Sequence, residues 1–143
     1  MVQALLDTSV LFAAAYARDG RHNDALPILR GVNDGTLPEG IVLDYVLAET
    51  LNGLVRKAST AAAEDFLDRI EVNQRFHVAR LSEDEFSTAK STFYRWSGLS
   101  LVDAALVSYA RSRSLEYLYT FDDDFDGPQG ISRLTSPVNP YRP

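Results

Sequence analysis

Four acidic residues lie where a carboxylate is unusual as a simple surface charge. Asp7 and Asp122 each follow an apolar run, and Glu49 and Asp103 lie within helical patterns. Grouped carboxylates repel one another, and their oxygens bind hard divalent cations. The four residues therefore predict a site for Mg²⁺ or Mn²⁺, and the chemistry that we expect from it is metal-dependent cleavage of a phosphodiester bond.

Three of these acids also fit a purely structural role, and they fit it to different degrees. Asp7 is also suited to a helix cap or an Asx-turn. Glu49 has no basic residue three or four positions away, whereas a solvated helix charge often has such a partner. Asp103 has apolar helical neighbours such as Leu106, which predicts partial burial, but it also fits a capping box with Ser100. The two roles of Asp103 are compatible because a carboxylate has two oxygens.

The acidic run that begins at Asp122 leaves the choice of ligand open. Asp124 is a possible ligand that would support or replace Asp122. The run also matches the start of an EF-hand loop, but its twelfth position is Arg133 in place of glutamate, and a predicted strand precedes it. For Asp123 and Asp126, a plain solvated acidic turn is the alternative.

Bulk composition restricts the class of protein. The chain has 143 residues, 45% of them hydrophobic, with no cysteine and two histidines. One domain over residues 1–143 is predicted, without disulfides, thiolate catalysis or cysteine-bound zinc. The sequence has no apolar stretch of about 18 residues and no basic segment before its first apolar run, so we expect a cytoplasmic protein without a membrane span. The net charge of −6 disfavours nonspecific binding to phosphates, although bound metal would offset part of it.

Short apolar segments alternate with helical patterns along the chain. Strands are predicted over 2–6, 40–43, 76–79, 116–120 and 131–134, and helices over 10–17, 24–32, 44–57, 60–72, 83–96 and 101–112. This alternation predicts an α/β fold with a short, mostly parallel sheet of about four or five strands flanked by helices. Since ligands bind at the carboxyl ends of such strands, Asp7 and Asp122 are expected at one edge.

Local signals set the expected helix boundaries. Ser9 is the expected N-cap of the first helix. Pro27 is tolerable only if it lies in the first turn of the second helix. Ser82 and Glu85 are spaced as a capping box.

Three short segments and one helical residue together carry a family resemblance. Residues 5–11 (LLDTSVL), 100–106 (SLVDAAL) and 120–125 (TFDDDF), with Glu49 in its helix, resemble the PIN-domain ribonucleases, most closely the VapC-type toxins of toxin–antitoxin pairs. The resemblance implies a three-layer PIN-like fold and a Mg²⁺- or Mn²⁺-dependent endoribonuclease. It also implies an RNA substrate, a small antitoxin partner and a homodimer.

The resemblance assigns roles to individual residues. It makes Asp7, Glu49, Asp103 and Asp122 the catalytic and metal-binding quartet, with Asp124 as a possible further ligand. It gives Thr8, Ser9 and Thr120 supporting hydrogen bonds. The expected products carry a 5′-phosphate and a 3′-hydroxyl. This chain is more acidic than many members of the family, which leaves its mode of RNA binding open.

Candidate RNA contacts come from the basic and aromatic residues near these segments. Arg18, Arg21 and Arg56 are candidate phosphate contacts, and Tyr45 is a candidate for base stacking. The alternative for the arginines is ordinary surface charge.

Other functions compete with a toxin. A housekeeping RNA-processing nuclease and a noncatalytic PIN-like binding module both fit the pattern. An aspartate-nucleophile phosphatase of the haloacid dehalogenase type fits poorly, because it needs a second aspartate two positions after Asp7, where Ser9 stands.

Overall fold

A five-stranded parallel sheet organises the molecule. In the computed structural model, which describes residues 2–128 and 130–142, the strand order is β3-β2-β1-β4-β5 and every neighbouring pair is parallel. The strands are β1 (Gln3–Leu6), β2 (Glu39–Leu43), β3 (Phe76–Ala79), β4 (Tyr117–Tyr119) and β5 (Ser132–Leu134). The prediction of a short parallel sheet flanked by helices is confirmed.

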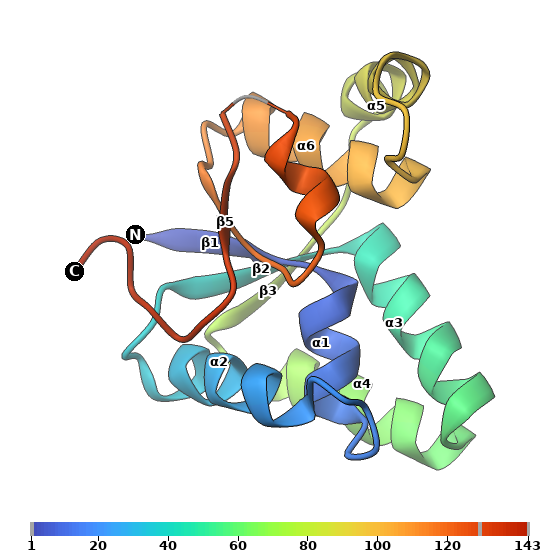
Figure 1. Ribbon diagram of the computed structural model, residues 1–143. Coiled ribbons are helices and arrows are strands. Elements are labelled where there is room, and N and C mark those ends of the chain that lie inside the picture. The colour runs from blue at the N-terminus through green and yellow to red at the C-terminus, as the bar shows by residue number, and fades with distance from the viewer. Residues whose placement is uncertain (1, 129, 143) are drawn as a thin grey trace.

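The helices cover the sheet on both faces. They are α1 (Thr8–Ala15), α2 (His22–Asp34), α3 (Asp44–Lys57), α4 (Thr60–Val72), α5 (Glu83–Arg95) and α6 (Leu101–Ser112), followed by the 3-10 helix η1 (Asp123–Asp126). Helices α1 to α4 lie on one side of the sheet, and α5 and α6 lie on the other (Figure 1). Within the described part of the chain, each helix is too short or too polar to cross a membrane.

The handedness of the connections explains this division. The chain moves from β1 through β2 to β3 in one direction, and it then returns past β1 to β4. Because crossovers between parallel strands are right-handed, a reversal of direction places the next helices on the opposite face. The reversal lies between β1 and β4, and such a switch point is where open α/β sheets bind ligands.

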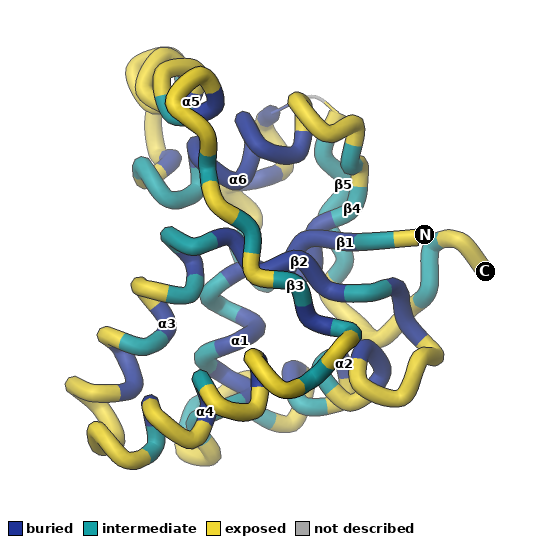
Figure 2. The backbone as a smooth tube through the Cα atoms, turned by 180° about the vertical axis from the view of Figure 1, so that it is seen from behind, coloured by how far each residue is buried: buried dark blue, intermediate teal, exposed yellow. Residues whose placement is uncertain are grey.

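The core lies around β1 and β2. Leu5, Leu6, Val42 and Leu43 are buried, and the tube in Figure 2 is buried through the middle of the sheet and exposed on the outer helices. Helix α6 is also buried, without interruption, over residues 104–110. A sheet covered on both faces needs near-continuous apolar strands, which this chain supplies. The strand ends at the switch point are therefore rigidly supported.

Side-chain caps begin three helices as predicted. Ser59 accepts the backbone N–H of Ala62 at 3.0 Å at the start of α4. Capping boxes open α5, between Ser82 and Glu85, and α6, between Ser100 and Asp103. Because such boxes satisfy N–H groups that the helix leaves unpaired, these starts are fixed locally by sequence.

Two helix-boundary predictions are wrong. Helix α1 begins at Thr8 with Asp7 as its preceding residue, and Ser9 is not its cap because its hydroxyl donates to Asp7. Helix α2 begins at His22, so Pro27 lies in its second turn. There the proline leaves one backbone carbonyl without its helical partner, at an exposed position where water can replace the missing bond.

Candidate functional site

Asp7 lies at the switch point of the sheet. It directly follows β1, only 4% of its surface is exposed, and its backbone N–H donates to Tyr119 O at 3.1 Å. That bond extends the pairing of β1 with β4 by one residue. The Asp7 carboxylate is thus fixed between the carboxyl ends of two neighbouring strands.

Two hydroxyl groups hold the Asp7 carboxylate. Ser9 Oγ donates to Asp7 Oδ2 at 2.9 Å, and Thr120 Oγ1 donates to the same oxygen at 2.7 Å. In return, Ser9 Oγ accepts the backbone N–H of Phe121 at 3.1 Å, and Thr120 Oγ1 accepts that of Asp122 at 3.0 Å. The network connects the end of β1 to the segment after β4, so Asp7 and Asp122 have a fixed relation.

Asp103 joins this site from the first turn of α6. Its Oδ2 accepts the Ser100 N–H at 3.3 Å, and its own N–H donates to Ser100 Oγ at 3.1 Å, so the predicted capping box is present. Burial, together with the charges of Asp7 and Asp122, raises the pKa of Asp103 to about 6 against the opposing hydrogen bonds from Ser100. The capping role and the acidic site therefore coexist in one side chain.

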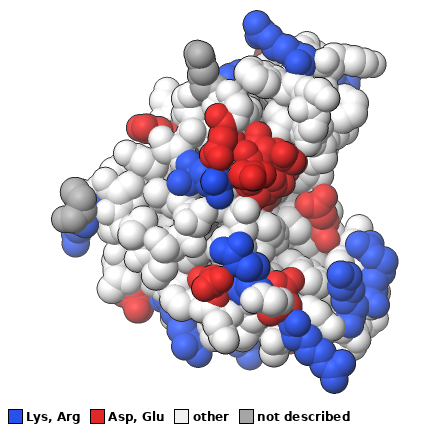
Figure 3. All heavy atoms as spheres, in the orientation of Figure 1, with Lys and Arg blue, Asp and Glu red and all other residues white. Residues whose placement is uncertain are grey.

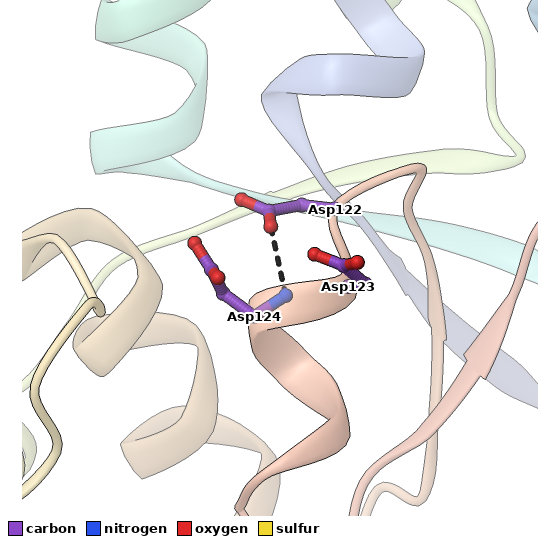
Figure 4. A group of neighbouring side chains, drawn as sticks. All are labelled: Asp122, Asp123 and Asp124. Carbon is purple, nitrogen blue, oxygen red and sulfur yellow. Dashed lines mark hydrogen bonds between the residues drawn. The ribbon is translucent and has the colours of Figure 1, made fainter.

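The tightest acidic group follows β4. Carboxylate oxygens of Asp122, Asp123 and Asp124 lie within 4.8 Å of one another, and Asp124 N–H donates to Asp122 Oδ1 at 2.9 Å (Figure 4). The charge of Asp122 raises the pKa of Asp124. Asp126 lies apart from this group, since both of its oxygens accept from Arg133, at 3.0 and 3.1 Å.

The same electrostatic pattern extends to Asp7. Burial raises the pKa of its carboxyl, hydrogen bonds from Thr120 and Ser9 partly offset that rise, and the charge of Asp122 adds to it. Acidic side chains gather at the centre of one face of the molecule, with basic side chains around them (Figure 3). Asp7, Asp103 and Asp122 are thus coupled electrostatically, and their role as metal ligands stays a prediction.

Glu49 is related to this set less directly. It is exposed on α3, and α3 packs against α1 where the Phe12 ring lies 3.2 Å from the position that a Cβ on Gly53 would take. Both helices leave the same edge of the sheet. Glu49 precedes Gly53 by one turn, and Thr8 precedes Phe12 by one turn. Glu49 therefore lies on the site end of the α1–α3 contact, and its place in the quartet stays a prediction.

The remaining predicted residues fall into different environments. Thr8 Oγ1 is buried without a hydrogen-bond partner among the described residues. Arg18 and Arg56 are exposed. Tyr45 is half-buried, and its ring packs edge-on against Phe86 with centroids 6.0 Å apart, which limits the face that it offers to a base.

Two residues of the site were not selected from the sequence. A solvated turn was the alternative for Asp123, yet this residue belongs to the close group with Asp122 and Asp124. Phe121 contacts the Arg21 guanidinium, whose central carbon lies 4.0 Å from the ring centroid. Asp123 carried a signal, because it stands within an acidic run. The partner of Phe121, 100 positions away in the chain, carried none.

The donor set suits a hard divalent cation. Oxygen ligands from three neighbouring carboxylates match the preference of Mg²⁺ and Mn²⁺. Raised pKa values at Asp7, Asp103 and Asp124 show that negative charge is crowded here, and a bound cation relieves such crowding. The unpartnered hydroxyl of Thr8 adds a neutral oxygen beside Asp7.

The sequence and the fold both match known proteins. The family model of the PIN domain matches residues 4–129. No curated protein matches the sequence significantly. Among solved structures, VapC20 of Mycobacterium tuberculosis, described as a toxin that cleaves the sarcin–ricin loop, is 24% identical with a TM-score of 0.78, over 96% of this chain and 99% of that one.

Two further structures have the same architecture. A toxin–antitoxin complex from Klebsiella pneumoniae is 20% identical with a TM-score of 0.62, over 95% of this chain and 98% of that one. VapBC2 from Rickettsia felis, bound to a DNA fragment from its promoter, is 14% identical with a TM-score of 0.69, over 92% of this chain and 97% of that one. At these identities the likeness establishes a shared fold.

Proposed function

Because this chain belongs to the PIN domain family, we propose that it is a Mg²⁺- or Mn²⁺-dependent endoribonuclease that acts as the VapC-type toxin of a toxin–antitoxin pair. The observation that carries the proposal is the placement of Asp7, Asp103 and Asp122 at the switch point of the sheet, where burial and the charge of Asp122 raise the pKa values of Asp7 and Asp103. Buried structural acids are normally paired with cations, whereas Asp7 has only hydroxyl donors and the charge of Asp122 acts against its ionised form.

Different residues have different parts in the proposed chemistry. Asp7, Glu49, Asp103 and Asp122 form the quartet that holds the metal, with Asp123 and Asp124 as additional oxygen ligands. When bound, the metal supplies Lewis acidity and lowers the pKa of a water molecule. Ser9 and Thr120 keep the Asp7 carboxylate oriented through their hydroxyl groups. Thr8, whose buried hydroxyl has no partner among the described residues, is the third supporting residue next to Asp7.

The substrate is RNA that is single-stranded or looped. Such RNA leaves its bases unstacked and accessible, while the deep, narrow major groove of an RNA duplex keeps side chains from its base edges. The sarcin–ricin loop cut by VapC20 is the first loop to test. Arg18 and Arg56 are exposed candidates for phosphate contacts, and Tyr45 is a candidate for edge contact with a base.

An antitoxin partner follows from the same proposal. Relatives with this fold are solved as toxin–antitoxin complexes. We propose that this chain forms a homodimer and is blocked in the cytoplasm by a small antitoxin. Growth arrest on expression, reversed by the antitoxin and absent in Asp7→Asn, would distinguish a toxin from a housekeeping RNA-processing enzyme.

Cleavage by purified protein tests the nuclease directly. Wild type, Asp103→Asn and Asp122→Asn are compared on a sarcin–ricin-loop hairpin and an unstructured RNA, with Mg²⁺, Mn²⁺ or EDTA. We expect cutting only with metal, and a loss on the order of 100-fold or more in both variants. Asp68→Asn, an exposed acid on α4, is the control and should cut normally. Cutting in EDTA, or full activity of Asp103→Asn, would reject the proposed mechanism.

A further inference from the structure

Arg21 brings a positive charge to the acidic site from a distant part of the chain. It lies in the loop between α1 and α2, and its guanidinium carbon is 4.0 Å from the centroid of the Phe121 ring. Asp122 is the next residue after Phe121. The loop thus places a cation against the residue that adjoins the acidic group.

The position of Arg21 is set before any ligand binds. Its backbone N–H donates to Asp19 Oδ1 at 2.8 Å, and its Nε donates to Asp24 Oδ2 at 2.9 Å. The neighbouring His22 contacts Ala13 O through Nδ1 at 2.8 Å, which ties the loop to α1. A free surface arginine loses rotamer entropy when a ligand immobilises it, and these bonds have already restricted the Arg21 side chain.

The Phe121 ring is itself tied to the acidic site. Its backbone N–H donates to Ser9 Oγ at 3.1 Å, and Ser9 Oγ donates to Asp7 Oδ2 at 2.9 Å. Two hydrogen bonds and one ring contact therefore connect Arg21 to Asp7. The fold therefore fixes the distance between the Arg21 guanidinium and the Asp7 carboxylate.

Arg21 keeps donors for a ligand. Contact with the ring uses the face of the guanidinium, and the Asp24 bond uses Nε alone. Nη1 and Nη2 have no hydrogen-bond partner among the described residues, and half of the side-chain surface is exposed. Two coplanar N–H groups of an arginine match two oxygens of one phosphate.

We propose that Arg21 binds a phosphate of the RNA strand beside the scissile bond, and that Phe121 and Asp24 are positioning residues for it. This inference rests on the proposed ribonuclease function. An RNA strand that approaches Asp122, Asp123 and Asp124 is repelled by them, and a fixed cation next to this group offsets the repulsion where the backbone passes. The chain carries a net charge of −6, so local placement of one arginine matters more than overall charge.

The chain offers a matched control for Arg21. Arg69 on α4 also pairs through Nε with one carboxylate, Asp65 Oδ2, at 3.0 Å, and its side chain is 78% exposed. Arg21→Gln and Arg69→Gln each remove one charge and break one comparable ion pair. Arg21→Lys keeps the charge and removes the planar fork. Phe121→Leu removes the aromatic ring, whereas Phe121→Tyr keeps an aromatic ring at this position.

Binding and cleavage are measured separately. Affinity for a labelled sarcin–ricin-loop hairpin and for an unstructured RNA is measured at several salt concentrations, with Asp103→Asn in every protein so that the RNA stays uncut. We expect Arg21→Gln to weaken binding by roughly tenfold. Its slope of log affinity against log salt should fall by about 0.7. Arg21→Lys and Phe121→Leu should lie between this variant and wild type, with Phe121→Tyr near wild type and Arg69→Gln unchanged.

The outcomes separate this inference from the proposed function. Cleavage by the same variants in an otherwise unmodified chain should fall in parallel with binding. If Arg21→Gln and Arg69→Gln bind and cut equally well, the assignment of Arg21 is overturned. If the wild type never cuts RNA but binds it through Arg21, the nuclease proposal fails and the Arg21 assignment stands. If the protein binds neither the hairpin nor the unstructured RNA, the nuclease proposal and the Arg21 assignment both fail.

Discussion

The hydroxyl groups of Ser9 and Thr120 each have one proton to donate, and this determines which atom is the donor in each of their hydrogen bonds. Ser9 and Thr120 both donate to Asp7 Oδ2, so the 3.2 Å contact between their own oxygens has no proton left to share. Their lone pairs are used by the N–H groups of Phe121 and Asp122. A buried carboxylate held by two donors keeps one orientation, which is the preorganisation that a metal ligand needs.

Burial of Asp103, together with repulsion from neighbouring acids, makes metal-free stability depend on pH. Its pKa is raised from an ordinary 3.8 to about 6 in the folded protein. The ionised carboxyl therefore costs folding free energy above about pH 6, and the cost disappears below about pH 4, where both states are protonated. Without metal, we expect Asp103→Asn to be more stable than wild type at pH 8 by about 1 kcal/mol, after allowance for solvent screening.

Denaturant unfolding in EDTA at pH 8 and pH 4 measures this difference. The two proteins should converge at pH 4. Saturating Mg²⁺ at pH 8 should reverse the order, because the metal stabilises the protein that binds it. An Asp103→Asn variant that is less stable than wild type in EDTA at pH 8 would contradict the repulsion described here.

At the scale of elements, the sequence allowed most helices and strands to be predicted. Apolar runs bounded by polar turns fixed the strands, and the capping boxes at Ser82 and Ser100 fixed two helix starts. The start of α1 was mispredicted because the Ser9 hydroxyl donates to Asp7 and accepts from the N–H of Phe121, which is 112 positions away in the chain. Local rules do not include such a competitor.

The acidic site was predictable to a similar extent. Asp7, Asp103 and Asp122 stood out because a carboxylate at a strand end or on an apolar helix face is costly without a role. Strand order and the contact of Arg21 with Phe121 were not predictable, since both depend on pairing between distant segments. Glu49 stays a prediction, because its exposure on α3 gives no electrostatic sign of coupling.

One buried acid, Glu85, links the first turn of α5 to the end of α6 by hydrogen bonds. Glu85 Oε1 accepts the Ser82 N–H at 2.9 Å, while Oε2 accepts from Ser112 Oγ and, at 3.2 Å, from Arg113 Nε. Burial alone would raise the pKa of Glu85, but these hydrogen bonds lower it to about 2. The ionised form therefore stabilises the fold above about pH 4.5, and this contribution is lost as pH falls towards 2.

We expect Glu85→Gln to lower the free energy of unfolding by about 1 kcal/mol at pH 7, because it keeps the shape of the side chain and removes its charge. Glu83→Gln, in the same first turn but exposed, is the control and should change stability by only a few tenths of a kcal/mol. Unfolding curves at pH 7 and pH 3 measure both variants, and the deficit of Glu85→Gln should shrink at pH 3. A deficit that is equal at both values would mean that charge is not its cause.

At the scale of the whole molecule, hydrogen bonds tie the segment after β5 to β4, to the turn before β2 and to β1. Tyr119 OH donates to Val138 O at 2.7 Å, Asn139 Nδ2 donates to Thr36 O at 3.0 Å, and Tyr141 OH donates to Gln3 O at 3.0 Å. The segment lies beyond residue 129, where the family match ends. It runs back to the amino end of β1, away from the acidic edge (Figure 1).

Loss of these hydrogen bonds should lower the stability of the fold without affecting RNA cleavage. Tyr119 is fully buried, so we expect Tyr119→Phe to lower the free energy of unfolding by about 1 kcal/mol. Tyr141→Phe, at an exposed position, should cost less. Thermal unfolding gives the stabilities, and RNA cleavage at a temperature well below unfolding should match wild type for both. A specific loss of cleavage in Tyr119→Phe would mean that the tail supports the site.

The strand order also determines when the site is complete during synthesis. Asp7 is made long before the rest of the site, because β1 pairs with β4 more than 100 positions later, and Asp103 and Asp122 come from the same later part of the chain. A nascent chain on the ribosome therefore carries Asp7 without its hydroxyl donor Thr120 and without the acids that complete the site. Such a chain folds its ends together only after the segment beyond β4 has emerged. The acidic site is thus complete only after β4 and the acidic run that follows it have emerged from the ribosome.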